Sequence, residues 1–222
     1  MEPPFVPYQP ERLPLPEGLR RGRDLVEHLD RRRSVRSFRS DPVPREAIEL
    51  AVRAANTAPS GAHLQPWTFV AVSDPDLRHQ IRLAAEVEER RFYRDRDVPD
   101  WHEALAKLGT DEDKDYLDLV PWLVVVFAQK QTRLPDGRVR KNYYVSESVG
   151  LACGLFIAAL HTMGLATLPH TPSPMGFLTT LLDRPPTERP YILFPVGYPS
   201  SDCRVPDIVR KPLTEALVFA AP

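Results

Sequence analysis

The chain of 222 residues is long enough to form one large domain with a substantial hydrophobic core. Its net charge of -1 and pI near 6.6 give no reason to expect a nucleic acid as partner. Two cysteines cannot build a disulfide framework, so a reducing cytosol is the simplest compartment. The N-terminal Met-Glu-Pro-Pro lacks the basic start and apolar core of a secretory signal.

The first 56 residues contain a proline-rich stretch and two helical patterns. Residues 1–22 have little periodicity, which predicts an extended N-terminal arm ahead of a single domain at residues 23–222. Arg23 to Arg33 is predicted as a short helix. Arg45 to Asn56 is predicted as a second helix, because apolar residues recur in it at a spacing of three to four. These apolar residues are Ile48, Ala51, Val52 and Ala55.

An arginine-rich segment, Arg31 to Phe38, follows the first predicted helix. It contains four arginines and two serines. Guanidinium groups bind phosphate oxygens bidentately, and a serine hydroxyl adds a further donor. Taken alone, however, such a charge run is more often a solvated face than a binding site.

The segment Thr57 to Trp67 joins the second helix to a predicted buried strand at Thr68 to Val72. Pro59 cannot continue a helix, and Gly61 permits a positive φ or a close approach of the backbone. The hydroxyl of Ser60 and the backbone N–H groups that follow it would form a small, donor-rich concavity. By itself the segment fits an ordinary helix-to-strand loop equally well.

A charged segment occupies residues 86–118. Before it, Asp74 and Pro75 predict the start of a further helix by N-capping and by proline in the first turn. The charged segment has few apolar anchors, among them Phe92 and Trp101. It is either a solvated helical hairpin, which the pattern alone favours, or a lid that becomes ordered over a ligand.

Further elements complete the second half of the chain. The apolar run Val149 to Leu168 approaches membrane-spanning length, but its polar residues, its glycines and the following Pro169 favour a buried helix, a turn and a strand. Alternating strands and helices predict an α/β or α+β fold with one central sheet. The predicted strands are Trp122–Ala128, Leu165–Pro169, Tyr191–Tyr198 and Ala216–Ala220; the predicted helices are Tyr143–His161 and Met175–Leu182; a turn is predicted at Pro135–Gly137.

Signatures of several other enzyme classes are absent from the sequence. There is no Gly-x-Gly-x-x-Gly motif, phosphate-binding P-loop, His-Glu-x-x-His or Cys-x-x-Cys pair. The scattered histidines form no metal set, so no metal site is predicted. Ser60 has no obvious paired base for a hydrolase triad. His63 and His170 adjoin candidate site segments and are expected to form hydrogen bonds rather than to transfer protons.

Two motifs carry a family resemblance. RRSVRSF, followed by TAPSGAHLQPW, resembles the FMN-dependent nitroreductase superfamily, and APSGAH is similar to its iodotyrosine deiodinase branch. The resemblance runs in order from about Leu25 to the C-terminus. It identifies residues 86–118 as the lid of that branch. Further matching segments are Glu88–Tyr93, Trp101, Lys114–Asp118, Tyr143–Tyr144, Ala152–Gly154, Thr171–Pro172, Pro195–Pro199 and Val205–Pro212.

The resemblance implies a fold and an FMN site. The implied fold is a nitroreductase-like central mixed sheet flanked by helices, in a homodimer with exchanged terminal arms and two flavins at the interface. Pro59, Ser60 and Gly61 would line the flavin ring, and the Thr171 hydroxyl would hydrogen-bond flavin N5, which favours one-electron steps. The residues implied to hold the phosphate and the ring edge are Arg32, Arg33, Ser34, Arg36 and Arg210.

The resemblance also implies a substrate. Glu89 and Tyr93 lie four residues apart on one helix face, and with Lys114 they would bind an amino-acid zwitterion. The backbone N–H of Ala62 would stabilise the substrate phenolate. Ala62 and Thr171 are therefore the expected catalytic residues. The implied reaction is reductive dehalogenation of iodo-, bromo- or chlorotyrosine to tyrosine and halide through the flavin semiquinone.

Other functions remain open at this point. A broad-specificity NAD(P)H-dependent nitroreductase or quinone reductase would share the flavin site but would have no use for Glu89, Tyr93 and Lys114. A flavin-fragmenting branch shares the arginine motif, and a flavin- or tyrosine-binding module is the non-enzymatic alternative. The electron donor is NAD(P)H through a reductase, or another donor. We expect a soluble, cytoplasmic enzyme without nucleic-acid or membrane partners; His170 stands where a smaller hydroxyl residue is implied.

Overall fold

The computed structural model describes residues 4–95 and 99–220, and it divides the chain into two compact units, Met1–Arg32 and Arg33–Pro222. Residues 1–3 of the expected arm and residues 96–98 of the expected lid lie outside the described residues. The second unit begins at Arg33, whereas the sequence predicted that the domain begins at residue 23.

The first unit consists of a helix preceded by an irregular segment. Residues 4–14 have no regular structure, as expected, but α1 (Leu15–Asp30) begins well before the predicted start at Arg23. The prolines do not prevent this, because Pro16 lies in the first turn, where the helix does not need its N–H. Glu17 also accepts hydrogen bonds from Arg20 and Arg21 on the next turn. The expectation of an extended arm through residue 22 was therefore wrong.

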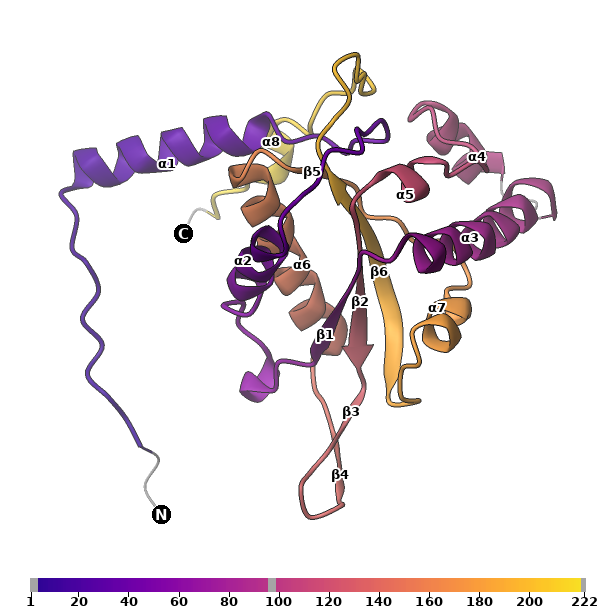
Figure 1. The fold of residues 1–222 in the computed structure, drawn as a ribbon. Helices are drawn as coiled ribbons and strands as arrows, with labels where there is room; N and C mark the ends of the chain where they lie inside the picture. The colour runs from indigo at the N-terminus through magenta and orange to yellow at the C-terminus, as the bar shows by residue number, and fades with distance from the viewer. Residues whose placement is uncertain (1–3, 96–98, 221–222) are drawn as a thin grey trace. The chain divides into compact units, whose positions relative to one another are not determined.

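The second unit is built on a central sheet of four strands in the order β1-β2-β6-β5 (Figure 1). All three strand pairs are antiparallel, and parallel pairing occurs at an isolated bridge between Ser34 and Thr167. The α+β class with one central sheet is confirmed, although the sheet is antiparallel where a mixed one was expected. The strands are β1 (Trp67–Val72), β2 (Trp122–Gln129), β5 (Ala166–Thr167) and β6 (Glu188–Gly197).

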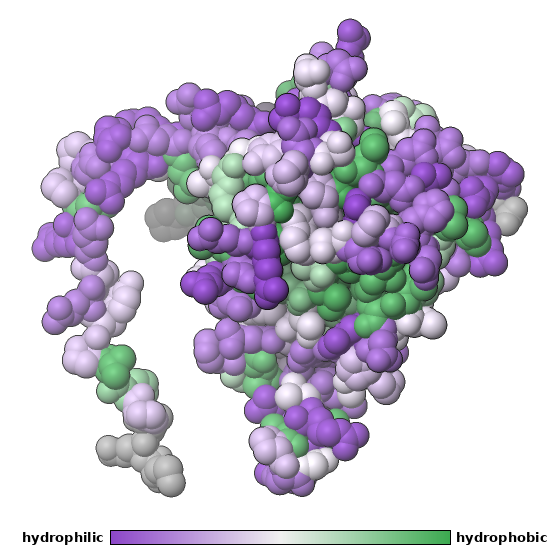
Figure 2. All heavy atoms as spheres, viewed as in Figure 1, coloured by the Kyte–Doolittle hydropathy of each residue, from purple (hydrophilic) through white to green (hydrophobic). Residues whose placement is uncertain are grey.

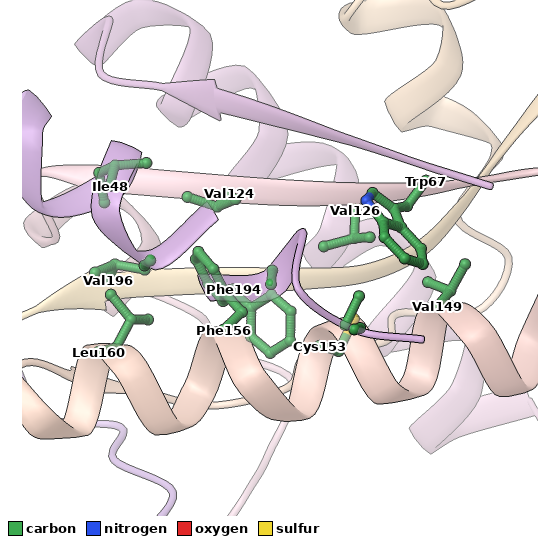
Figure 3. Close-up of a cluster of buried hydrophobic side chains, with 14 of the residues drawn as sticks. Ile48, Trp67, Val124, Val126, Val149, Cys153, Phe156, Leu160, Phe194 and Val196 are labelled. Carbon is green, nitrogen blue, oxygen red and sulfur yellow. The ribbon is translucent and has the colours of Figure 1, made fainter. Parts of the chain in front are cut away.

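Helices cover both faces of this sheet (Figure 1). The long helix α6 (Val145–Thr162) and α2 (Arg45–Ala55) lie on one face, where Phe156 and Leu160 pack against Val124 and Phe194 (Figure 3). The other face carries α3 (Pro75–Asp95), α5 (Tyr116–Leu119) and α7 (Gly176–Leu181). Because β2 is covered on both sides, its six central residues are all buried, which explains its near-continuous apolar sequence.

Several shorter elements complete the unit. The predicted turn at Pro135–Gly137 connects two unpredicted short strands, and Gly137 adopts a φ of 84° there. Residues 217–220 form no strand, so that prediction was wrong; they lie exposed after a short helix. These elements are the 3-10 helix η1 (Gly61–His63), α4 (Pro99–Ala106), α8 (Leu213–Ala216), β3 (Gln131–Arg133) and β4 (Val139–Lys141).

Helix α6 has an apolar side that does not face the sheet. By length and hydropathy it resembles a membrane-spanning helix, but core helices share this character, and one third of it is buried in the unit (33%). The predicted helix–turn–strand over Val149–Leu168 is confirmed, with the turn at Gly164 (φ 74°). The outer side exposes Leu151 (52%), Leu155 (38%), Gly150 and Gly154. Leu151 and Leu155 lie four residues apart and form an exposed apolar stripe on this side of α6.

Candidate functional site

A cavity of about 130 Å³ lies beside α3 in the second unit. Four parts of the chain that are distant in sequence form its wall: Arg36, the second half of α3 with α4, the segment 110–116, and the segment 168–173 after β5. The outer surface over α3 is mainly hydrophilic (Figure 2). The wall of the cavity mixes charged and aromatic side chains. The lining residues used below are Arg36, Glu89, Tyr93, Lys114, His170 and Thr171.

Helical spacing brings Glu89 and Tyr93 to the cavity together, as predicted. Both lie in α3, whose start is capped by Asp74, because Asp74 Oδ1 accepts a hydrogen bond from the Leu77 N–H at 2.8 Å. Residues four apart lie on one face of a helix. The Tyr93 hydroxyl donates to the carbonyl oxygen of Thr110 at 3.2 Å, which orients the ring.

Lys114 is the most buried charged residue of the cavity, with a side chain only 3% exposed. Its backbone N–H donates to Glu86 Oε1 at 3.0 Å, and Glu86 is itself paired with Arg82. Its ammonium group donates to the carbonyl of Asp111 and lies 3.7 Å from Glu89 Oε2. Residues that looked like solvated surface charges in the sequence therefore form a buried network.

The charges of this network perturb one another. Burial is the largest influence on the pKa of Glu89 and would raise it, but the hydrogen bond from His170 and the charge of Lys114 outweigh burial. The pKa of Glu89 is therefore lowered, and Glu89 is a carboxylate at neutral pH. Burial lowers the pKa of Lys114, and the carboxylate of Glu89 opposes this only in part. A ligand with complementary charges would relieve the cost of burying both groups.

His170 is the site residue whose contacts the sequence did not predict. Its Nε2 lies 3.0 Å from Glu89 Oε1, and its side chain is 7% exposed. The expectation that it forms a hydrogen bond is confirmed, but its partner comes from α3, which is distant in sequence. Its position directly before Thr171 was the only sequence signal that associated it with a site.

An aromatic cluster closes the outer side of the cavity. The Phe92 ring is buried and lies 4.8 Å from the Trp101 ring and 5.1 Å from the His102 ring, between centroids. Tyr93 stacks on His102 with centroids 5.8 Å apart. These contacts join α3 to α4 across the cavity. Several residues of the charged segment therefore line the cavity, and the role of the segment as a lid stays a prediction.

Two residues expected to hold a flavin line the same cavity. Arg36 and Thr171 come from segments that β5 brings together, since the Val35 N–H donates to the Thr167 carbonyl at 3.2 Å. The Nε atom of Arg36 is buried and has no hydrogen-bond partner among the described residues. Buried polar atoms normally have partners, so this donor fits an anionic or hydrogen-bonding ligand.

The other phosphate-binding candidates are Arg32, Arg33 and Ser34, which precede Arg36 in the chain, and Arg210 near the C-terminus. The Arg33 guanidinium donates to the carbonyl of Pro206, which brings the arginine segment beside the C-terminal segment that carries Arg210. Ser34 forms the bridge to Thr167. Arg210 is exposed. Arg32 ends the first unit, and its role in phosphate binding stays a prediction.

The loop Pro59–Ala62 lies beside the start of α6. The Gly61 N–H donates to Ser148 Oγ at 3.2 Å, and Ser60 Oγ accepts a hydrogen bond from the Gln65 N–H at 3.0 Å. Ala62 is exposed, adopts a φ of 50°, and its N–H makes no hydrogen bond within the described chain. Of the backbone donors expected here, the Gly61 N–H is therefore already used within the chain, and the binding role of the Ala62 N–H stays a prediction.

Within one chain the two signature segments are far apart. Gly61 contacts the start of α6, whereas the bridge between Ser34 and Thr167 lies beyond the end of α6. The 18 residues of α6 span about 27 Å at roughly 1.5 Å per residue. Within one copy of the chain, Gly61 and the bridge of Ser34 therefore lie near opposite ends of α6.

Replacing Gly61 by alanine is expected to destabilise the protein by about 1–3 kcal/mol. The added Cβ would lie 2.8 Å from the Tyr143 carbonyl oxygen and 2.9 Å from Tyr144 Cδ2, and the backbone oxygen cannot move freely. Urea unfolding measures the change. Gly18→Ala is the control, because its Cβ would meet no atom within 4 Å; equal stability of the Gly61 variant and wild type would contradict the close packing of this loop.

Comparisons with known proteins identify the family of this chain. The model of the nitroreductase family matches residues 29–198. An iodotyrosine deiodinase of Haliscomenobacter hydrossis is 49% identical over 217 residues, which are 98% of this chain and 98% of that protein. The iodotyrosine deiodinase of Danio rerio is 44% identical and covers 97% of this chain and 74% of its own. A crystal structure of oxidized iodotyrosine deiodinase bound to FMN and 3-iodo-L-tyrosine has a TM-score of 0.75 at 30% identity, covering 89% of this chain and 98% of that one.

Proposed function

This chain belongs to the nitroreductase family, and we propose that it is an FMN-dependent reductive dehalogenase of halogenated tyrosines. The observation that carries the proposal is the convergence of Glu89, Tyr93 and Lys114 on one cavity that also contains Arg36 and Thr171. In the reaction two electrons and one proton enter, the carbon–halogen bond becomes a carbon–hydrogen bond, and halide leaves.

The residues present fit FMN, because Arg36 offers a buried, unpartnered donor beside Thr171. Arg32, Arg33, Ser34, Arg36 and Arg210 would hold the phosphate and the ring edge. Thr171 would hydrogen-bond ring nitrogen N5, and Pro59, Ser60 and Gly61 would line the ring. When bound, FMN supplies the electrons for the reaction.

The lid residues recognise the amino-acid end of the substrate. Glu89 and Lys114 already form an ion pair in a largely buried cavity, with 3.7 Å between Nζ and Oε2. A zwitterion can replace this pair without leaving a buried charge uncompensated: its ammonium binds Glu89, its carboxylate binds Lys114, and Tyr93 bonds to either group. A simple phenol cannot make this exchange, which is why the three lid residues favour a halotyrosine.

We propose a homodimer, because in one copy Gly61 contacts the start of α6, whereas Ser34, two residues before Arg36, pairs with Thr167 after the end of α6. A second copy can supply the loop Pro59–Ala62 to the cavity of the first. The exposed apolar stripe of α6 is a suitable interface, since Gly154 leaves open space for a partner backbone. Exchange of the terminal arms and closure of the lid at about residues 86–118 are part of this proposal.

Ala62 completes the proposed site from the second copy. Its exposed, unpartnered N–H would donate a hydrogen bond to the phenolate oxygen of the substrate. A fixed backbone donor stabilises negative charge without reorganisation during the reaction. This stabilisation would hold the substrate ring in the orientation needed for loss of the halide.

The remaining assignments concern the surroundings of the enzyme. Both cysteines are free, which fits a reducing compartment such as the cytosol. We propose a cytoplasmic enzyme without a nucleic-acid or membrane partner. Its electron donor is either NAD(P)H through a reductase or another donor.

Reduced, FMN-loaded protein mixed anaerobically with 3-iodotyrosine is expected to form tyrosine and iodide while the flavin becomes oxidised. Chromatography of the products and the flavin absorbance measure the two halves of the reaction. Tyrosine itself is the control, because it has no halide to lose. Oxidation of the flavin without tyrosine formation would leave a flavoprotein of another specificity, and an unchanged flavin would overturn the proposal.

A further inference from the structure

His170 is fixed by its main chain as well as by its side chain. Its N–H donates to the Leu193 carbonyl at 2.8 Å, and its carbonyl accepts from the Leu193 N–H at 2.9 Å, so β6 determines where its ring begins. The ring then reaches Glu89, with 3.0 Å between Nε2 and Oε1. The other ring nitrogen, Nδ1, is buried and has no hydrogen-bond partner among the described residues.

The state of Glu89 determines which nitrogen of His170 carries the proton. Because Glu89 is a carboxylate, Nε2 must be the donor in the contact between them. Burial is the largest influence on the pKa of His170 and lowers it. The positive charges of Lys114 and Arg36 also lower this pKa, whereas the hydrogen bond to Glu89 and its negative charge raise it; the net shift is downward. The imidazole is therefore neutral at neutral pH, with its hydrogen on Nε2 and its lone pair on Nδ1.

We propose that His170 is a positioning residue for the recognition of the substrate: as a neutral donor it holds one oxygen of Glu89 and leaves the other oxygen to the substrate ammonium. This inference rests on the proposed dehalogenase function and adds His170 to the residues that determine its substrate specificity. A neutral donor orients a carboxylate without cancelling its charge. A cation at the same place would form an ion pair with Glu89 and would compete with the ammonium group.

The geometry divides the two oxygens of Glu89 between two partners. Oε1 faces His170, and Oε2 lies 3.7 Å from Lys114. When a substrate carboxylate binds Lys114, Oε2 is released and can receive the ammonium, while Oε1 stays fixed. His170 therefore keeps Glu89 in place during the exchange of ion partners.

The groups around His170 predict how this role depends on pH. Glu89 faces it from α3, Lys114 and Arg36 face it from two loops, and Tyr116 of α5 lies with its ring centroid 6.4 Å away. Burial raises the pKa of Tyr116, so it stays neutral. Protonation of His170, which begins below the ordinary histidine pKa of about 6.5, would neutralise Glu89. Preference for the amino-acid end should therefore fall as the pH is lowered.

Two variants and two ligands test the proposal. The ratio of the dissociation constants of 2-iodophenol and 3-iodotyrosine, measured by calorimetry on the oxidised FMN-loaded dimer, isolates the amino-acid end because both ligands carry the same halophenol. In the wild type we expect the preference for iodotyrosine to decrease at least about threefold between about pH 8 and pH 5. His170→Gln keeps a neutral N–H donor and cannot titrate, so it should retain the preference and lose this pH dependence.

His170→Leu removes the donor and should reduce the preference for iodotyrosine about tenfold or more across the whole pH range, since Glu89 is no longer held. The affinity for iodophenol and the FMN content report whether each variant folds. A pH dependence retained in His170→Gln would overturn the proposal, as would an unchanged preference in His170→Leu. If the leucine variant fails to bind FMN, the pH profile of the glutamine variant decides.

Failure of this inference differs from failure of the proposed function. If the wild type binds iodotyrosine no better than iodophenol, the amino-acid site itself is wrong, and His170 has nothing to position. If the wild type prefers iodotyrosine and the variants do not differ from it, only the role of His170 is wrong. The calorimetric ratio distinguishes these outcomes without measuring turnover.

Discussion

Replacing Leu151 by arginine is expected to convert the protein into a monomer that does not retain FMN. Leu151 lies in the exposed apolar stripe of α6, with 52% of the residue accessible. In a two-fold symmetric interface one substitution introduces two like charges into apolar surroundings, a change that costs several kcal/mol. Because each flavin would need the loop Pro59–Ala62 of the second copy, separation of the copies should remove the cofactor as well as activity.

Light scattering and flavin absorbance measure the two expected losses in the same sample. Leu83→Arg is the matched control: it introduces the same residue at a similarly exposed position (45%) on α3, outside the proposed interface. The control should remain a dimer and should keep its flavin. A Leu151 variant that is monomeric but retains FMN and activity would contradict the composite site, whereas a variant that remains dimeric would contradict the assignment of this face.

Replacing Lys114 by methionine is expected to reduce kcat/KM for halotyrosines at least about a hundredfold, because loss of one partner of a buried charged contact costs about 2–5 kcal/mol. Methionine nearly preserves the side-chain volume, so the effect should come from the lost ammonium group. That group is the only lysine ammonium lining the cavity among the described residues, and its side chain is 3% exposed. Turnover of a nitroaromatic or a free halophenol should change less than about threefold, because these substrates lack the amino-acid end.

Steady-state kinetics with both classes of substrate, at equal FMN content, measure this difference. Lys107→Met is the matched control, since Lys107 directly follows α4, has a 70% exposed side chain and pairs with Glu103 of α4. It should behave as the wild type with both substrates. A Lys114 variant that loses both activities equally would indicate a general loss of the site, and one that loses neither would favour a broad nitroreductase.

Local patterns predicted most of the secondary structure because the physical causes are local. The apolar residues of α2 recur every three to four positions, and Asp74 caps α3. Both features depend only on residues close together in the chain, and both are confirmed. The errors have other causes. The tail at residues 217–220 pairs with no strand among the described residues, and the start of α1 depended on Pro16 being tolerated in a first turn. The positions of Glu89 and Tyr93 were predictable because both lie on one helix.

By itself the sequence determined the family, the α+β class and the residue types available for chemistry, since these follow from motif order and hydrophobic periodicity. Only the tertiary structure decided that Glu86, Glu89, Lys114 and His170 form one buried network, because the contact of His170 with Glu89 joins residues 81 positions apart. It also decided that Gly61 contacts the start of α6, whereas the bridge of Ser34 with Thr167 lies after its end. Such distances depend on how the sheet and helices pack, and no pattern of neighbouring residues encodes them.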